Sequence, residues 1–165
     1  MELLIFSDSH GKADAMQQAL SRMVRRPDGV LFLGDGLRDA ERLEQDIPWY
    51  MVIGNCDWFG GERPDEIVMA MEGHTLLLTH GHRYSVKSGL GALLYHAVEV
   101  GADVVTYGHT HVPELQIVEA GEIVAGKPLE KPIYLFNPGS IGSSEHSFGT
   151  LTLRPDLVFF SHGNL

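Results

Sequence analysis

Hydrophobic residues follow two alternating spacings in the first half of the chain. Apolar runs over residues 2–7, 29–34 and 49–54 have the length of buried strands. Between them, residues 13–24 and 38–45 place apolar side chains at helical spacing. On the first of these predicted helices the apolar face consists of Met16, Leu20, Met23 and Val24. This alternation predicts parallel strands joined by helical crossovers.

The second half of the chain is mostly strand-like. Residues 66–82 contain two apolar runs joined by a short turn around Gly73, which is typical of a hairpin. Residues 86–101 have the spacing of an amphipathic helix. Further strands are expected at 114–120, 133–140, 149–153 and 157–162. An α/β fold of two mixed β-sheets, packed as a sandwich and flanked by helices, accommodates both halves.

Composition indicates one ordinary globular domain. The chain has 165 residues, 44% hydrophobic and 21% charged, so a single domain over residues 1–165 with a sizeable core is predicted. The net charge of −10 argues against a general binder of nucleic-acid phosphates, because such a protein needs surplus Lys and Arg. The apolar start is too short for a signal peptide or a membrane span, and Cys56 is the only cysteine. We therefore expect a cytoplasmic protein without membrane contact that acts on a small substrate.

Metal-competent side chains follow the predicted strands. They are Asp8, His10, Asp35, Asn55, His80, His109 and His111. Because the carboxyl ends of strands in α/β sheets meet at one edge, these residues are expected to converge in one cleft. Each residue alone is more often a helix cap, a turn former or a surface histidine. Seven such residues at strand ends, most of them beside a glycine, favour a metal site.

Five motifs in a fixed order carry a family resemblance. They are DSHG at 8–11, GDG at 34–36, GNCD at 54–57, THGH at 79–82 and GHTH at 108–111, with NPGS at 137–140, which is predicted to be a structural turn. With these motifs the sequence resembles the calcineurin-like metallophosphoesterases, and within them the small YfcE-type phosphodiesterases. The resemblance implies the metallophosphoesterase fold, with four layers in the order αββα. This fold agrees with the one expected from the hydrophobic pattern.

The resemblance also implies a site for two divalent metal ions. Asp8, His10 and His111 would hold one ion, Asn55, His80 and His109 the other, and Asp35 would bridge them. Oxygen and imidazole ligands suit Mn²⁺, Ni²⁺, Fe or Zn²⁺ rather than Ca²⁺, with Mn²⁺ expected first and Mg²⁺ as a further candidate. A hydroxide bridging the ions would attack the phosphorus without a covalent intermediate, and Asp35 and Asn55 would be catalytic as well as ligating.

Two positions leave the protonation of the leaving group open. Many enzymes of this family carry a histidine after the motif asparagine, where it protonates the leaving oxygen, but this chain has Cys56 there. We predict that Cys56 is a small apolar residue packed under its loop. His82 lies two residues beyond His80, on the same side if the segment is extended. It is a candidate for the catalytic acid or a substrate contact, and equally for a residue that orients a ligand.

The expected function is hydrolysis of small phosphodiesters. A phosphomonoesterase or a nucleotide polyphosphate hydrolase would use the same residues, and a comparison of substrates separates these reactions. A non-catalytic protein-binding scaffold with this fold, like the retromer subunit, is the alternative from another class. Missing ligands would favour the scaffold, whereas all seven positions are filled here. The strand-rich second half also allows a homodimer through a sheet edge.

Overall fold

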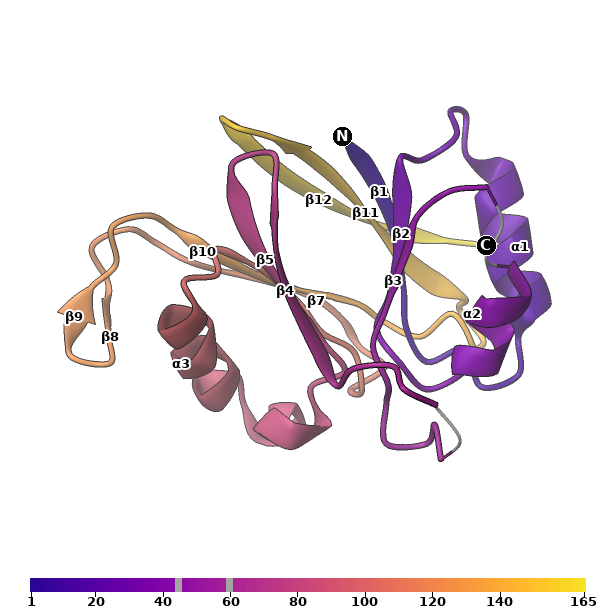
Figure 1. Ribbon diagram of the computed structural model, residues 1–165, viewed down its shortest axis with the longest axis horizontal. Helices are drawn as coiled ribbons and strands as arrows, with labels where there is room; N and C mark the ends of the chain where they lie inside the picture. Colours follow the sequence, from indigo (N-terminus) through magenta and orange to yellow (C-terminus); the bar gives the residue numbers. More distant parts are fainter. Residues whose placement is uncertain (44–45, 59–60) are drawn as a thin grey trace.

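Two mixed five-stranded sheets lie face to face in the computed structural model, which describes residues 1–43, 46–58 and 61–165 (Figure 1). The first sheet has the strand order β12-β11-β1-β2-β3. Its strands are β1 (Glu2–Phe6), β2 (Gly29–Phe32), β3 (Trp49–Met51), β11 (Ser147–Arg154) and β12 (Leu157–Asn164). The strands β1, β2 and β3 are parallel, as the alternating pattern predicts. The strand β11 runs antiparallel to both β1 and β12.

The second sheet has the strand order β4-β5-β6-β10-β7. Its strands are β4 (Glu66–Met71), β5 (His74–Thr79), β6 (Val104–Thr106), β7 (Pro113–Val118) and β10 (Ile133–Pro138). The predicted hairpin is present as the antiparallel pair β4 and β5, while β6 is parallel to both of its neighbours. Because β7 and β12 end their sheets, each has an open edge, and the homodimer stays a prediction.

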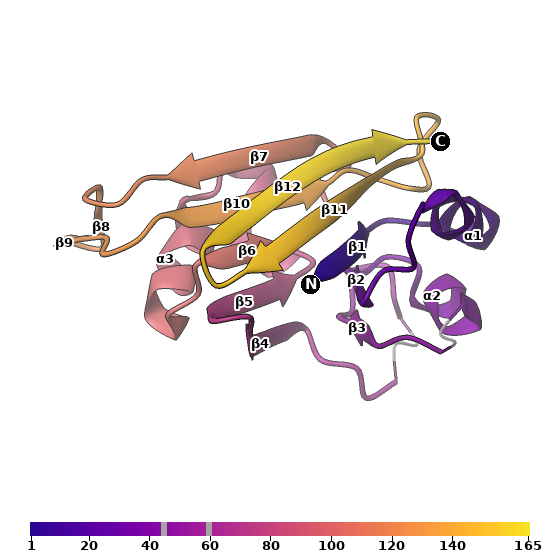
Figure 2. The ribbon, with the colours of Figure 1, turned by 90° about the horizontal axis from the view of Figure 1, so that it is seen from above.

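Helices cover the outer faces of the two sheets (Figure 2). The helices α1 (Ala13–Arg22) and α2 (Leu37–Leu43) pack on the first sheet, and α3 (Gly91–Val100) packs on the second. On β1, Leu3 and Ile5 face the core between the sheets, whereas Leu4 and Phe6 face the helices. Burial on both faces explains why this strand is a continuous apolar run. The predicted four-layer sandwich is confirmed.

Some element boundaries differ from those predicted. The helix expected over residues 86–101 begins only at Gly91, because Ser85 and Gly89 have φ values of 52° and 137° and bound a 3-10 turn, η2 (Val86–Ser88). Val24 is fully exposed rather than part of an apolar face, since α1 has already ended at Arg22. The helix predicted over 38–45 is α2, and positions 44 and 45 lie outside the described residues.

One short hairpin was not predicted from the sequence. The strands β8 (Ile123–Val124) and β9 (Lys127–Pro128) have two residues each, too few for a periodic pattern. They form a small two-stranded sheet that projects away from the sandwich, beyond α3 (Figure 1). Among the described residues, no helix is long and apolar enough to cross a membrane.

A buried carboxylate ties three segments of the second sheet together before β6. Asp103 is 3% exposed. Its oxygens lie 2.7 Å from Nδ1 of His74, 2.8 Å from the backbone nitrogen of Thr75 and 3.0 Å from Nζ of Lys131. Burial raises the pKa of Asp103, but the hydrogen bonds from His74, Thr75 and Lys131 outweigh burial, so the pKa lies below its ordinary value. The carboxylate is therefore a stabilising group of the fold.

Replacing Asp103 with asparagine is expected to lower the free energy of unfolding at pH 7 by about 2–3 kcal/mol, because an amide cannot serve all three donors. Since the folded pKa is depressed, the carboxylate stabilises the fold above the unfolded pKa of about 3.9, and this contribution is lost as the pH falls through the folded pKa. Urea unfolding at several pH values checks both points. The exposed Asp156, changed to asparagine, is the control, and a pH-independent effect of Asp103→Asn would contradict the assignment.

Candidate metal centre

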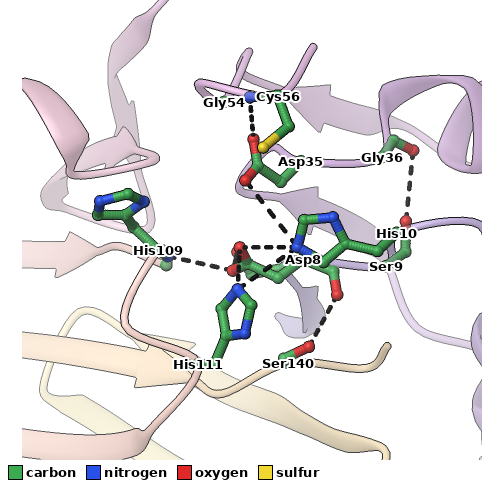
Figure 3. Close-up of polar contacts among 12 residues, drawn as sticks. Asp8, Ser9, His10, Asp35, Gly36, Gly54, Cys56, His109, His111 and Ser140 are labelled. Carbon is green, nitrogen blue, oxygen red and sulfur yellow. Dashed lines mark hydrogen bonds and ion pairs between the residues drawn. The ribbon is translucent and has the colours of Figure 1, made fainter. Parts of the chain in front are cut away.

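Loops at the carboxyl ends of five strands bring the predicted ligands together. Asp8 and His10 follow β1, Asp35 follows β2, Asn55 follows β3, His80 follows β5, and His109 and His111 follow β6. The first four residues come from the first sheet, and the three remaining histidines come from the second. Figure 3 shows Asp8 lying between the histidines of these loops. The site therefore lies where the two sheets meet, and all seven predicted residues contribute to it.

The backbone of these loops is strained at the predicted ligands. Asp8, His10, Asp35, His109 and His111 have φ values of 54°, 43°, 60°, 69° and 62°. This left-handed region costs a non-glycine residue on the order of 1–3 kcal/mol when the surroundings impose it. Five of the seven predicted ligands carry this conformation, and such strain clusters at functional sites. The loops are shaped to aim these side chains at a common point.

Glycines allow the loops to approach one another closely. A Cβ atom added to Gly54 would lie 2.1 Å from Oδ1 of Asp35. A Cβ atom added to Gly108 would lie 1.9 Å from Oγ of Ser7 and 2.9 Å from Oδ2 of Asp8. Any larger residue at these two positions would displace a carboxylate of the site or the group that holds it.

The first group of candidate ligands consists of Asp8, His10 and His111. One potential ligand atom from each residue lies within 4.8 Å of the others. Nε2 of His111 lies 3.0 Å from Oδ1 of Asp8, and Nε2 of His10 lies 3.7 Å from the same oxygen. The two imidazole nitrogens are 3.4 Å apart. The three side chains thus converge on one small volume.

The second group consists of Asp35, His80 and His109, whose ligand atoms also lie within 4.8 Å of one another. Nε2 of His80 is 3.4 Å from Oδ2 of Asp35 and 3.1 Å from Oδ1 of Asn55. Nδ1 of His80 donates to the carbonyl oxygen of Leu33 at 2.7 Å, and this hydrogen bond orients Nε2 towards the site. Asp35 reaches both groups, because its Oδ2 is also 4.0 Å from Nε2 of His10.

An orphaned oxygen shows that this donor set fits a divalent cation. Oδ1 of Asp8 is buried and accepts no hydrogen bond among the described residues, although the Nε2 atoms of His111, His10 and His80 lie 3.0, 3.7 and 3.9 Å from it. By contrast, Oδ2 of the same carboxylate accepts hydrogen bonds from the Ser7 hydroxyl and from the backbone N–H of His109. Burial of a carboxylate oxygen that accepts no hydrogen bond is costly, and a cation held by this oxygen and the surrounding imidazoles would remove that cost. Oxygen and nitrogen donors of this kind suit transition metals.

The charges at the site are strongly coupled. Burial raises the pKa of Asp35, but hydrogen bonding and charge attraction from His80 outweigh burial and hold that pKa well below its ordinary value. Burial lowers the pKa of His80, while Asp35 and Asp8 raise it above the usual value. Burial and repulsion from His80 lower the pKa of His109 to about 4, so His109 is neutral at pH 7 and has a free lone pair for a ligand.

Asp57 supports the site, although its role was not predicted from the sequence. Oδ2 accepts hydrogen bonds from the backbone N–H groups of Asp35 and Gly54, at 2.8 and 2.9 Å. Oδ1 accepts from Gly36 and Leu37, at 2.9 and 3.0 Å. One carboxylate therefore joins the loop after β2 to the loop after β3. Its place in the GNCD motif was the signal for a role, but sequence spacing does not show which donors it meets.

Other polar residues hold the remaining loops. Asp39 accepts from Oγ of Ser9 and from the backbone N–H of Gly11, both at 2.7 Å. Within NPGS, Nδ2 of Asn137 donates to the carbonyl oxygen of Gly108 at 2.9 Å, and Oγ of Ser140 donates to the carbonyl oxygen of Asp8 at 2.8 Å. This motif is structural, as predicted, and it supports the loops that carry the candidate ligands.

Two expectations about single residues are wrong in their geometry. The segment after His80 is not extended, because Gly81 has a left-handed φ of 97° and residues 82–84 form the 3-10 turn η1 (His82–Tyr84). The His82 ring nevertheless lies 5.5 Å from that of His80 and 6.1 Å from that of His109, measured between ring centroids. Cys56 is exposed rather than packed under its loop, and its backbone N–H donates to Oδ1 of Asp35 at 2.7 Å. Its thiol forms a further group with His10 and Asp35, whose potential ligand atoms lie within 4.8 Å of one another.

The chain resembles known proteins along most of its length. Residues 1–155 match the calcineurin-like phosphoesterase superfamily domain. The probable metallophosphoesterase YsnB of Bacillus subtilis is 33% identical over 160 residues, which cover 94% of this chain and 86% of that protein. The phosphodiesterase YfcE of Escherichia coli K12 is 29% identical over 180 residues, covering 92% and 87%. A structure of Vps29 from Entamoeba histolytica complexed with Zn²⁺ has the same fold, with a TM-score of 0.72 at 21% identity and 99% coverage of each chain.

Proposed function

The chain belongs to the calcineurin-like phosphoesterase superfamily, and from this premise we propose that it is a dinuclear metal-dependent phosphodiesterase acting on small phosphodiesters. The observation that carries the proposal is the convergence of two ligand groups, Asp8 with His10 and His111, and Asp35 with His80 and His109. The carboxylate of Asp35 reaches both groups. A carboxylate within reach of both sets of imidazoles is suited to a pair of ions, which can stabilise the attacking and leaving oxygens together.

The proposed ligand sets follow these groups. Asp8, His10 and His111 would hold one ion, Asn55, His80 and His109 the other, and Asp35 would touch both. Mn²⁺ is the first choice of metal, and Ni²⁺, Fe, Zn²⁺ and Mg²⁺ are the other candidates. When bound, such a pair supplies a water of lowered pKa and positive charge for the phosphoryl oxygens. Only two of the seven donors are carboxylates, so two divalent ions would keep a net positive charge that attracts a phosphate anion.

The protein's own groups would position the substrate and exclude other chemistry. Asn55 would orient the phosphoryl oxygens through its amide, and the ring of His82 would donate a hydrogen bond to substrate beside the second group. Burial and the Asp35 carboxylate raise the pKa of the Cys56 thiol, so Cys56 is protonated at neutral pH and is a poor nucleophile. A covalent intermediate on this thiol is therefore not part of the proposal.

Two features favour a diester over a monoester substrate. The relative YfcE is named a phosphodiesterase, and it matches 92% of this chain. The GNCD motif at 54–57, with Cys56 after Asn55, resembles that of the YfcE-type subgroup, for which hydrolysis of phosphodiesters is the implied activity. Hydrolysis of phosphomonoesters or of nucleotide polyphosphates at the same residues is the competing proposal.

A metal titration tests the proposed function. Metal-stripped protein is expected to be inactive, and activity towards bis(p-nitrophenyl) phosphate should return with Mn²⁺ and saturate near two equivalents. The same titration with p-nitrophenyl phosphate gives the reference rate for a monoester. A faster rate with the monoester would overturn the diester preference, and saturation at one equivalent would overturn the two-ion site.

Because the fold is like that of Vps29, a protein-binding scaffold is the alternative to an enzyme. That likeness lies below 25% identity and concerns the fold. The same titration separates the two functions, because a scaffold is expected to bind no substrate and to show no hydrolysis with any of the five metals. All seven donor positions hold a residue that can bind a metal ion, which favours the enzyme.

A further inference from the structure

A cavity of about 300 Å³ opens beside the first ligand group. Its wall includes His10 of that group, together with Cys56, Arg38 and Trp58. The cavity thus begins at the place where a phosphate would lie and extends over the start of α2. Its volume is at the lower end of the range for small-molecule sites, about 300–1,000 Å³.

The Trp58 side chain is unusually exposed for such a large apolar group. It is 86% exposed, whereas Trp49, the other tryptophan, is 8% exposed in the core under α1 and α2. Burial of a tryptophan ring is strongly favourable, so a ring exposed beside a cavity is available to stack on a ligand that enters it. Trp58 follows Asn55 by three residues, so a group stacked on its ring would lie close to the proposed reaction centre.

The polar groups in the wall are largely engaged within the protein. Both oxygens of Asp57 accept hydrogen bonds from backbone N–H groups, and Oδ2 of Asp39 accepts from Ser9 and Gly11. These two carboxylates therefore offer a ligand few new hydrogen bonds. The flat face of the Trp58 indole, by contrast, suits a planar aromatic ring.

We propose that this cavity binds the nucleoside part of the substrate and that the base stacks on Trp58, so that the substrate class is a mononucleoside phosphodiester. The inference rests on the proposed function, because it places the phosphate at the ligand groups. The net charge of −10 disfavours a polynucleotide, which would bring many phosphates against an acidic surface. Since stacking accepts any base, purine and pyrimidine nucleosides are both expected to bind.

Kinetics with matched diesters test the role of Trp58. Adenosine 5′-(methyl phosphate) and ribose 5-(methyl phosphate) contain the same diester, and only the former has a base. Trp58→Ala is expected to lower kcat/KM for the adenosine ester about tenfold and to leave the ribose ester unchanged, whereas Trp58→Phe keeps most of the activity. Tyr95→Ala, which removes an exposed aromatic ring on α3, is the matched control. Equal losses on both esters, or none, would overturn the proposal.

Fluorescence gives a second readout that needs no hydrolysis. In Trp49→Phe the only remaining tryptophan is Trp58, and this change removes an indole nitrogen that has no hydrogen-bond partner among the described residues. Titration with AMP, with and without Mn²⁺, is expected to quench this fluorescence, and ribose 5-phosphate is expected to have no such effect. Quenching without hydrolysis would refute the proposed function and keep the nucleoside site. Hydrolysis with no quenching by AMP would refute the nucleoside site alone.

Discussion

Replacing Asp35 with alanine is expected to lower the rate of diester hydrolysis about 10³-fold or more. The reason is the place of its carboxylate, whose Oδ2 lies 3.4 Å from Nε2 of His80 and 4.0 Å from Nε2 of His10. Removing it takes away a carboxylate that reaches both sets of candidate ligands. The measurement is kcat/KM for a chromogenic diester at saturating Mn²⁺, together with the number of metal equivalents bound.

A second variant separates charge from structure at this position. Asp35→Asn keeps an acceptor for the backbone N–H of Cys56, which now donates to Oδ1 at 2.7 Å, but it removes the negative charge. We expect Asp35→Asn to fold like the unchanged chain and to remain nearly as inactive as Asp35→Ala. Asp14→Asn, at an exposed position of α1, is the control. Activity close to that of the unchanged protein in Asp35→Ala would refute the dinuclear assignment.

The second large effect is expected at Asp57. Its side chain binds no side chain of a candidate ligand among the described residues, but it accepts a hydrogen bond from the backbone N–H of Asp35. Asp57→Asn places an amide group where the carboxylate now accepts four backbone N–H bonds, so two donors lose their acceptor. Metal affinity is expected to fall about 10–100-fold, as for other residues that orient ligands, and stability by about 2–4 kcal/mol.

Two measurements on Asp57→Asn distinguish loss of positioning from general unfolding. Competition with a chelating dye gives the metal affinity, and urea unfolding gives the stability. Asp65→Asn is the matched control, because the carboxylate of Asp65 pairs at 2.9 Å with the exposed Arg83 near the surface, where such pairs contribute little. An unchanged metal affinity in Asp57→Asn would show that the two loops keep their positions without this carboxylate.

Much of the fold was predictable, because a strand buried on both faces is a continuous apolar run in the sequence. The run from Leu3 to Phe6 is apolar throughout, since its side chains alternate between the core and the helices. Boundaries were less predictable where a single backbone angle decides them. Apolar residues such as Val86 and Leu90 have helical spacing, but positive φ values at Ser85 and Gly89 delay α3 until Gly91.

His82 lies near His80, as predicted, although the backbone between them does not have the predicted extended conformation. An extended segment was expected to carry it to the side of His80, but the chain turns at Gly81 and enters a 3-10 turn. The ring still faces the same cluster, because the turn lies at the end of β5 where both sheets meet. Cys56 was expected to be packed under its loop, but its thiol is exposed and lies near His10 and Asp35, because the loops after three different strands meet there.

The sequence by itself determined which residues stand at the strand ends, because strand length, turn glycines and polar strand ends are local properties. It thereby determined that Asp8, His10, Asp35, Asn55, His80, His109 and His111 would converge. Only the tertiary structure decided the distances between these side chains, that Asp57 holds two loops together, and that Trp58 lies exposed beside a cavity. These features depend on distances between segments far apart in the chain, which are set when the two sheets pack and which no local spacing encodes.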